Sequence, residues 1–552
     1  MALPVLPDRR RMFHCIVLAA VACCYYATYY DLRVSMYDES FTLYISQRMF
    51  SGDIPYRDFD PTYGVLWFYP IVFFFKFFGA TFNVMRIVLF GISCMTGILS
   101  FYIVDKITEN RVLAYVAAVS IIMLHAPIYR VLIPFAVALS ALVFTQCDFS
   151  QKHKIVPFGL SGFVTGVISL IRPEYSWPSA CLLFIFALCS AASAKRTFSP
   201  YAFIRNVTFA CLGIGLSYLP FLLLGAQYGF LGHFLREQSR FVVNCVSIVL
   251  ASFFGDSGNL AGGALTGLPR LPFAAMTYSW NNFVLGAATY CAPALLAAAA
   301  VCALLAPREP SSGTALPAHI RQVGVILVAL SPSFFTFFCY HPRMYQFFQL
   351  LPSMILLFAV VTGKWLRSRQ DGGRPLARCG VRVLCLCGIL MVFPAFVPSF
   401  NQVNLFLGPL ALSHADDRLE IPPLVSSRMP AEEVERIGGM LTSLDRYTES
   451  EDIVAVYPYM PGIYALSRKK PFGRRLYYDD GILAREPDWC EKEVKRFEDA
   501  PPKAVVICNW PINGRESSRF ANWAKPVYDH VVSRYRVVLS QEVNECRLYI
   551  LK

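Results

Sequence analysis

The stretch that decides the fold is YDESFTLYISQRMFSGDIPYRDFDPTYG, residues 37–64, which lies between the first hydrophobic segment and the next. Six acidic residues fall between Asp31 and Asp60, whereas the first 400 residues contain only 15 Asp and Glu in all. Charged side chains are costly beside lipid and gather where function needs them. We therefore expect the chemistry of this chain in this loop.

The composition around the loop is that of a polytopic membrane protein. The 552 residues are 56% hydrophobic and 16% charged, whereas soluble domains are about one quarter charged. Residues 1–400 carry 29 Lys and Arg against 15 Asp and Glu, and residues 401–552 carry 21 against 22. A basic surplus in membrane loops indicates orientation and contact with lipid phosphate, so nucleic-acid binding is excluded and membrane lipids are the expected neighbours.

About twenty apolar residues cross a bilayer, and this length predicts eleven transmembrane helices. They lie near residues 12–30, 82–104, 112–127, 131–147, 155–171, 176–194, 206–225, 281–306, 323–339, 344–363 and 384–400. With the N-terminus in the cytoplasm, 18 Lys and Arg fall in cytoplasmic loops and 10 outside, as the positive-inside rule requires. The acidic loop and the C-terminal part are then both extracytoplasmic, and short loops favour a bacterial inner membrane with the site in the periplasm.

Two further segments of the loop are predicted to be helices that do not cross the membrane. Residues 60–79 are apolar but contain Pro61, Pro70 and Lys76, so we expect an interfacial helix lying along the membrane. Residues 40–51 place apolar side chains at helical spacing, which predicts an amphipathic helix directly after Asp38 and Glu39.

From residue 401 the composition becomes that of a soluble α/β domain. Helices are predicted at 431–447 and 517–535, strands at 452–458 and 501–510, and a hairpin at 535–552. The predicted domains are therefore a transmembrane part, 1–400, and an extracytoplasmic α/β domain, 401–552. Cys490, Cys508 and Cys546 are an odd number, so one disulfide is allowed and none is required.

The order of motifs in the loop resembles a known superfamily. A first span is followed by DE at 38–39, an amphipathic segment, SGD at 51–53, PYRD at 55–58 and an apolar segment ending in FFG at 77–79. This order resembles the first outer loop of the GT-C glycosyltransferases, closest to the protein O-mannosyltransferases and the lipid A aminoarabinose transferases. The detailed resemblance covers residues 12–104, and RPE at 172–174 and the α/β tail extend it coarsely.

The resemblance implies a GT-C-like membrane fold and a glycosyltransferase. Such an enzyme takes a sugar from a polyprenyl-phosphate donor and passes it, with inversion, to a lipid, polysaccharide or protein acceptor on the outer face. Asp38 would be the base that removes the acceptor proton, and Glu39 would orient Asp38 or the acceptor. The alternative for Asp38 is a helix cap, because Asp is favoured before the first turn of a helix.

The remaining candidates are polar residues at the outer ends of predicted spans and in the loop. Asp58 and Asp60 would bind the acceptor, or a divalent cation together with Glu39, and otherwise form an Asp-Pro turn. Arginine suits a leaving phosphate because its planar fork donates two parallel hydrogen bonds. The substrate-binding candidates of this kind, with their neighbours, are Arg172, Glu174, His341, Arg343 and Tyr345, with Arg130 a weaker one. His341 is also a candidate metal ligand, the metal itself stays unknown, and no other cofactor is implied.

Two other classes of protein remain open. A transporter or flippase of polyprenyl-linked or envelope precursors needs polar groups near mid-membrane, whereas most charges here lie at loop ends. A non-catalytic scaffold would use the α/β tail to bind a partner. That tail carries no GxGxxG after a strand, so its alternating pattern does not imply a nucleotide site.

Overall fold

The structure is a computed structural model that describes most of both predicted domains. The described residues are 9–28, 30–123, 131–146, 155–172, 199–239, 352–363, 417–511, 516–542 and 545–552, with isolated positions between 180 and 187 and at 366. The boundary predicted at residue 400 lies outside them.

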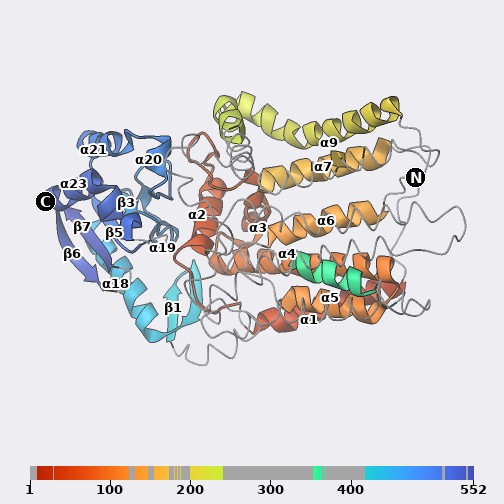
Figure 1. The fold of residues 1–552 in the computed structure, drawn as a ribbon. Coiled ribbons are helices and arrows are strands. Elements are labelled where there is room, and N and C mark those ends of the chain that lie inside the picture. The colour runs from red at the N-terminus through yellow and green to blue at the C-terminus, as the bar shows by residue number, and fades with distance from the viewer. Residues whose placement is uncertain are drawn as a thin grey trace, which may run out of the picture.

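Apolar helices form one half of the molecule and lie side by side in Figure 1. They are α1 (Arg9–Ala27), α4 (Phe82–Thr108), α5 (Arg111–Met123), α6 (Leu132–Gln146), α7 (Ile155–Ile171) and α9 (Pro200–Gln227), and residues 352–363 are also helical. Small residues allow α7 and α9 to approach closely: a Cβ on Gly162 would lie 2.0 Å from the carbonyl oxygen of Ala210. Such close backbone contact is typical of membrane helices.

The predicted number of eleven spans is not confirmed. Among the described residues, two helices, α4 and α9, are long and apolar enough to cross a membrane, and six further apolar helices are shorter. Helices are present at the predicted spans near 12–30, 82–104, 112–127, 131–147, 155–171 and 206–225, and over the last part of 344–363. The spans predicted at 281–306, 323–339 and 384–400, and most of 176–194, lie outside the described residues.

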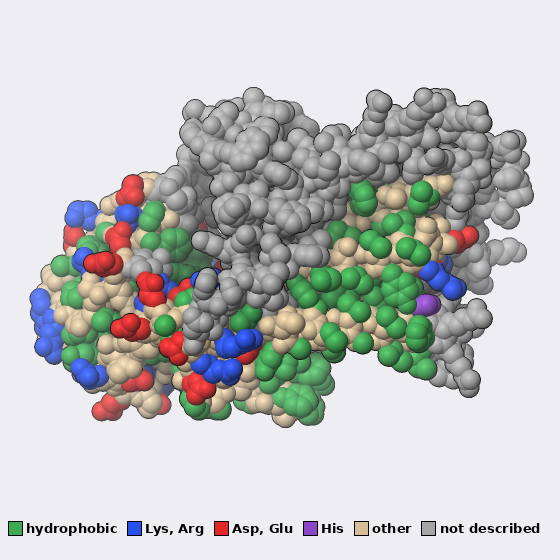
Figure 2. All heavy atoms as spheres, turned by 90° about the horizontal axis from the view of Figure 1, so that it is seen from below, with side chains coloured by type: hydrophobic (Ala, Val, Ile, Leu, Met, Phe, Trp, Pro, Cys, Tyr) green, Lys and Arg blue, Asp and Glu red, His purple; other side chains and the backbone are tan. Residues whose placement is uncertain are grey.

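Surface chemistry separates the two halves of the molecule. In the part of the helical half that Figure 2 shows in colour, hydrophobic side chains predominate over charged ones, whereas Lys, Arg, Asp and Glu gather on the other half. A few charged groups reappear at the far end of the helices in the same view. An apolar band between two polar ends is the pattern expected of a protein embedded in lipid.

The predicted interfacial segment contains two short helices, η1 (Val65–Trp67) and α3 (Tyr69–Phe78). Phe73, Phe74, Phe77 and Phe78 of α3 are exposed, whereas its Phe75 side is buried. An exposed row of phenylalanines on a short helix is suited to the membrane interface. The position of α3 along the membrane remains a prediction.

The predicted amphipathic segment is α2 (Asp38–Phe50), which begins at the acidic pair instead of after it. Residues 39–46 are all buried, so α2 is an internal helix and not a surface one. It lies at the junction of the two halves in Figure 1, contacting α3 on one side and α19 (Gly462–Ser467) of the other half on the other. The sequence of this segment predicted one apolar face. The structure buries a second face of α2 as well, against α19.

The outer half is an α/β domain built on a five-stranded sheet. Its strand order is β4-β3-β5-β7-β6, with β3 parallel to β4 and β5, and β7 antiparallel to β5 and β6. The strands are β3 (Ile453–Tyr457), β4 (Lys470–Pro471), β5 (Ala504–Cys508), β6 (Tyr535–Gln541) and β7 (Cys546–Leu551). The helices around it are α18 (Ala431–Tyr447), α20 (Ile482–Arg485), α21 (Trp489–Asp499), η7 (Glu516–Ser518), α22 (Phe520–Trp523) and α23 (Lys525–Arg534). The predicted helix at 431–447, both inner strands and the terminal hairpin are all found.

A disulfide joins the two central strands of this sheet. Cys508 of β5 and Cys546 of β7 are paired residues in the ladder and are bonded, whereas Cys490 is a free, buried cysteine. Of the two possibilities that the sequence left open, one disulfide or none, the structure has one.

A second, two-stranded sheet attaches the outer domain to the start of the loop. Strands β1 (Asp417–Ile421) and β2 (Val425–Met429) form an antiparallel hairpin that the sequence did not predict. Its Arg428 exchanges backbone hydrogen bonds with the segment around Asp31, and its guanidinium donates to both carboxylate oxygens of Asp31 at 2.9 and 2.8 Å. Burial of Asp31 raises its pKa, but the Arg428 hydrogen bonds outweigh that effect and the pKa is lowered.

Candidate active site at the junction of the two halves

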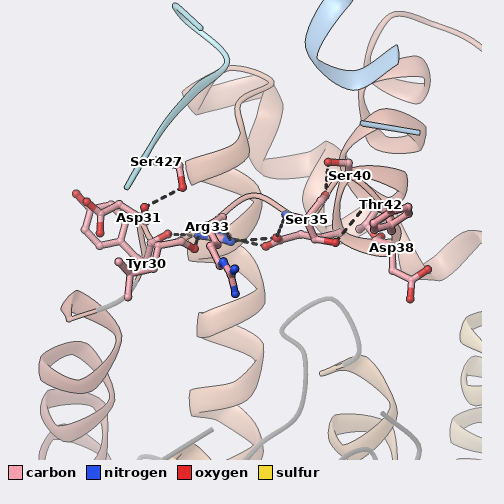
Figure 3. Close-up of polar contacts among 12 residues, drawn as sticks. Tyr30, Asp31, Arg33, Ser35, Asp38, Ser40, Thr42 and Ser427 are labelled. Atoms are coloured by element: carbon pink, nitrogen blue, oxygen red, sulfur yellow. Dashed lines mark hydrogen bonds and ion pairs between the residues drawn. The ribbon is translucent and has the colours of Figure 1, made fainter. Parts of the chain in front are cut away.

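Asp38 is the first residue of α2 and is half-buried at the junction of the helical half with the outer domain. The N-cap position belongs to Tyr37, and no side chain caps the helix there, so the capping alternative for Asp38 is wrong. The hydroxyl of Tyr459 donates a hydrogen bond to Asp38 Oδ1 at 2.7 Å. In Figure 3 the Asp38 side chain points away from the polar contacts that run from Asp31 to Ser35.

Glu39 points to the other side of α2 and is held by Arg86 of α4. The Arg86 Nε and Nη2 atoms donate to Glu39 Oε1 and Oε2 at 2.7 and 3.0 Å. The same guanidinium donates to the carbonyl oxygens of Tyr30 and Leu32 at 2.8 and 2.7 Å, and to that of Arg33. Both charged groups are buried. This cluster fixes the first turn of α2 against α4 and the extended segment before it.

Aromatic side chains surround the hydroxyl that contacts Asp38. The Tyr459 ring lies 6.2 Å from that of Tyr37, 6.3 Å from Phe41 and 5.0 Å from Tyr477, centroid to centroid. Phe41 and Tyr37 come from the loop, whereas Tyr459 and Tyr477 come from the outer domain. The two parts of the chain therefore share one aromatic cluster beside Asp38.

Arg172 reaches the same loop from the end of α7. Its guanidinium lies above the Tyr63 ring at 4.5 Å and near the Trp67 ring at 5.8 Å, both favourable cation–π distances. The Gly64 amide donates to the carbonyl of Ile171 at 3.1 Å, which ties the loop to this helix end. Tyr63 contacts Phe41 edge to face at 5.6 Å, so Arg172 joins the aromatic cluster that also holds Asp38.

Asp58 closes a local turn of the loop. It accepts hydrogen bonds from the Arg57 side chain at 2.8 and 2.8 Å and from the Ile54 amide at 2.7 Å. The Arg57 hydrogen bond is the main reason that the pKa of Asp58 is lowered, and the Ile54 amide adds to it. This turn lies before the Asp-Pro pair at residues 60–61, so it does not test the predicted Asp-Pro turn, and the role of Asp58 toward a substrate remains a prediction.

Asp60 joins three parts of the chain. Its Oδ1 lies 3.2 Å from Arg474 Nη2 of the outer domain and 3.2 Å from His233 Nε2, in a helical segment after α9. Its Oδ2 lies 3.7 Å from Arg475 Nε. Asp60 is therefore a link between the loop and the outer domain, and its part in acceptor binding also remains a prediction.

The other sequence candidates lie outside the described residues: Glu174, His341, Arg343, Tyr345 and Arg130. Within the described ranges, no group of three or more His, Cys, Asp or Glu side chains is arranged to hold a metal. The divalent cation thus stays a prediction.

Two concave surfaces flank α2 and the loop. A cleft of about 790 Å³ lies on the Glu39 side, between the segment 33–37 and α18, and is lined by Arg33, Arg436 and Met460 among others. A groove of about 390 Å³ runs between residues 49–56, α3 and α9, and is lined mainly by apolar side chains that include Phe73 and Phe221. The groove opens beside the exposed phenylalanines of α3.

Sequence reasoning missed two partners of the acidic pair. Arg86 carried a signal, because a lone arginine inside an apolar helix is costly without a carboxylate partner. Tyr459 carried none, because it is 421 positions from Asp38 and its local sequence, YPYMPGIY, has no charge or motif.

No protein-family model matches the chain, and no curated protein matches it. Several solved structures are similar to it, among them the following two. The oligosaccharyltransferase AglB from Archaeoglobus fulgidus, in complex with an inhibitory peptide and a dolichol-phosphate, is 12% identical, with 98% of this chain and 74% of that one covered at a TM-score of 0.49. ArnT from Cupriavidus metallidurans, bound to undecaprenyl phosphate, is 12% identical, with 97% of each chain covered at a TM-score of 0.47.

Membership of the GT-C superfamily therefore remains the prediction made from the first outer loop. Identities near one residue in eight and TM-scores below 0.5 assign neither an activity nor a substrate. The site geometry described above therefore carries the functional proposal.

Proposed function

We propose that this protein is an integral membrane glycosyltransferase that transfers a sugar from a polyprenyl-phosphate donor to an acceptor hydroxyl on the outer face of the membrane. The observation that carries this proposal is the placement of Asp38, a half-buried carboxylate between membrane helices and an outer domain, oriented by a hydroxyl at 2.7 Å. A lipid-linked donor and a water-borne or lipid acceptor meet at such a boundary.

The proposed reaction is a single displacement at the anomeric carbon. The acceptor oxygen forms a bond to that carbon while its proton passes to Asp38, and the bond from the carbon to the phosphate oxygen breaks. The phosphate leaves with the bonding electrons. Because the acceptor attacks the face opposite to the phosphate in one step, the configuration at the anomeric carbon inverts. Developing negative charge on the phosphate is best stabilised by a fixed cation in a dry site, and Arg172, held over Tyr63 and Trp67, is our candidate, together with Arg343.

Glu39 has a positioning role in this proposal, since both of its oxygens accept from Arg86. This contact fixes the start of α2 and thereby the place of Asp38. Asp58 and Asp60 shape the loop through their contacts with Arg57 and Arg474, and binding of the acceptor by these carboxylates is part of the proposal. The acceptor itself is a hydroxyl of a lipid, a polysaccharide or a protein.

The apolar groove between α3 and α9 suits the isoprenoid chain of the donor. Its lining is apolar along Tyr69, Phe73, Phe221 and Leu224, and Lys76 lies at the same groove. A chain of this kind is bound by burial of its surface and needs few polar partners.

An oxidising compartment for the outer domain is supported by the disulfide between Cys508 and Cys546. Disulfides persist in the bacterial periplasm, in the lumen of the endoplasmic reticulum and outside the cell, and the short predicted loops favour the bacterial case. We therefore propose an outward-facing site, in a bacterial inner membrane with the outer domain in the periplasm.

The test uses the purified full-length protein in lipid nanodiscs with a panel of undecaprenyl-phosphate-linked hexoses and pentoses, and measures released undecaprenyl phosphate. Asp38→Asn should lose turnover by about 10²- to 10⁴-fold, the usual worth of a general base, while still binding undecaprenyl phosphate by native mass spectrometry. Glu432→Gln is the matched control, because Glu432 is also an acidic residue in the first turn of a helix. Wild-type turnover in Asp38→Asn would remove Asp38 from the mechanism.

A further inference from the structure

We propose that Tyr459 of the outer domain is a positioning residue for Asp38, so that the membrane half cannot complete its reactive carboxylate without the outer domain. This inference rests on the proposed function. It adds Tyr459 to the proposed site. Tyr459 lies 421 positions after Asp38 in the sequence and belongs to the outer domain.

The contact itself is short and well placed. The Tyr459 hydroxyl donates to Asp38 Oδ1 at 2.7 Å, the length expected of a hydroxyl that donates to a carboxylate. The Tyr459 ring is 8% exposed and packs against Tyr37, Phe41 and Tyr477. Because the ring is held on three sides, its hydroxyl meets Asp38 in one direction.

Neighbouring contacts hold the backbone around Tyr459 against the loop. The Gly462 amide donates to the carbonyl of Met36 at 2.9 Å, and a Cβ on Gly462 would lie 2.8 Å from the Met36 Cα. Two residues further on, Tyr464 stacks on Tyr44 of α2 with ring centroids 5.3 Å apart. The start of α2 and the segment 459–464 are therefore fixed to each other on both sides of Asp38.

The chemical consequence concerns the direction of the carboxylate. A donor on Oδ1 fixes the rotation of the carboxyl plane and hence the direction in which Oδ2 faces. Transfer of a proton in the transition state depends on that direction as well as on distance.

The central variant is Tyr459→Phe, which removes one hydroxyl and keeps the packed ring. Turnover of undecaprenyl-phosphate-linked sugar should fall about tenfold to a hundredfold, the size of one hydrogen bond to a charged group. The KM for the donor should stay within about twofold, because Tyr459 does not serve the lipid groove.

Tyr464→Phe is the matched control. Tyr464 lies in α19, is buried, and donates its hydroxyl to the carbonyl of Val454 at 3.1 Å. Tyr464→Phe tests the effect of removing a buried hydroxyl from this region. Turnover and the KM for the donor should stay at wild-type values in the molecules that remain folded.

The outcomes separate this inference from the proposed function. Wild-type turnover in Tyr459→Phe with no turnover in Asp38→Asn overturns the positioning role and leaves the glycosyltransferase in place. Equal losses of turnover in Tyr459→Phe and Tyr464→Phe, or a loss in Tyr459→Phe that comes from a raised KM for the donor instead of a lowered kcat, also overturn it. Full turnover in Asp38→Asn overturns both.

Discussion

Glu39 and Arg86 form a buried ion pair in which two nitrogens of one guanidinium meet the two oxygens of one carboxylate, at 2.7 and 3.0 Å. The Glu39 and Arg86 side chains are only 5% and 7% exposed. If one of them is removed, bulk water therefore hydrates the remaining charge poorly. Since the same arginine also donates to three backbone carbonyls, the pair joins α2, α4 and the segment before α2.

Glu39→Gln should therefore destabilise the protein by about 3 kcal/mol, because removing one partner of a buried pair leaves the other charge uncompensated. The measurement is the thermal unfolding midpoint in detergent. Asp529→Asn is the control, since Asp529 pairs with Lys525 on the exposed surface of α23, where one ion pair contributes about 0.5 kcal/mol. Equal midpoints for Glu39→Gln and the wild type would show that the pair does not hold the junction together.

Gly64→Ala should separate the loop from α7. A Cβ on Gly64 would lie 2.1 Å from the carbonyl oxygen of Leu170, so either the loop or the helix end must move, at a cost of about 1 to 3 kcal/mol. Arg172 would then lose its place over Tyr63, and turnover should fall with stability. Gly91→Ala is the control, because nothing lies within 4 Å of its added Cβ. A Gly64→Ala protein as stable as Gly91→Ala would contradict the close approach.

Glu493 should make the outer domain less stable as the pH rises. Burial raises the pKa of this carboxyl, although the Tyr457 hydroxyl and Arg496 act in the opposite direction. Between the two pKa values, the folded domain holds a proton that the unfolded chain releases. The stability that protonated Glu493 contributes is therefore complete below the unfolded pKa of about 4.3. This contribution is lost as the pH rises through the pKa of Glu493 in the folded domain.

Glu493→Gln, which is neutral at every pH, should protect the outer domain better than the wild type at pH 8 and equally at pH 4. Hydrogen exchange in peptides covering β3 and α21 measures this difference. Glu498→Gln, on the exposed side of the same helix, should keep the wild-type pH dependence. Faster hydrogen exchange in Glu493→Gln than in the wild type at pH 8 would contradict this prediction, because it would mean that the ionised carboxylate stabilises the folded domain.

Replacing Cys508 and Cys546 together by alanine should cost about 4 kcal/mol in the outer domain, the loop-closure value for a separation of 38 residues. Peptide mapping without reductant should find the two cysteines linked and Cys490 as a free thiol. Recovery of Cys490 in a mixed disulfide, or an unchanged unfolding midpoint in the double variant, would count against this pairing.

Periodicity made the outer domain predictable in its regular parts. Apolar residues at helical spacing predicted α18, with the bounds that the structure has, and short runs rich in Val and Ile predicted β3 and β5. The β1–β2 hairpin was missed because its sequence is polar and its stability comes from elsewhere: Arg428 bonds to Asp31, almost 400 residues earlier.

The sequence predicted the candidate residues of the first loop and of α7, but not the residues that orient them. The order of motifs around Asp38 and Glu39 pointed to the loop, and a lone Arg at the end of a span pointed to Arg172. The contacts that orient them depend on packing between distant segments, which no local pattern encodes. For the same reason the burial of α2 was missed, since the second apolar surface that covers it belongs to α19.

The burial of α2 between the two halves also sets the order of events during biosynthesis. Tyr459 leaves the ribosome 421 residues after Asp38, so during most of translation the apolar side of α2 that α19 will cover has no neighbour. A nascent chain released before residue 459 exposes the apolar side of α2 and lacks the hydroxyl that contacts Asp38. Under the proposed function, such an incomplete chain would be inactive, so activity would begin only when both halves have been made.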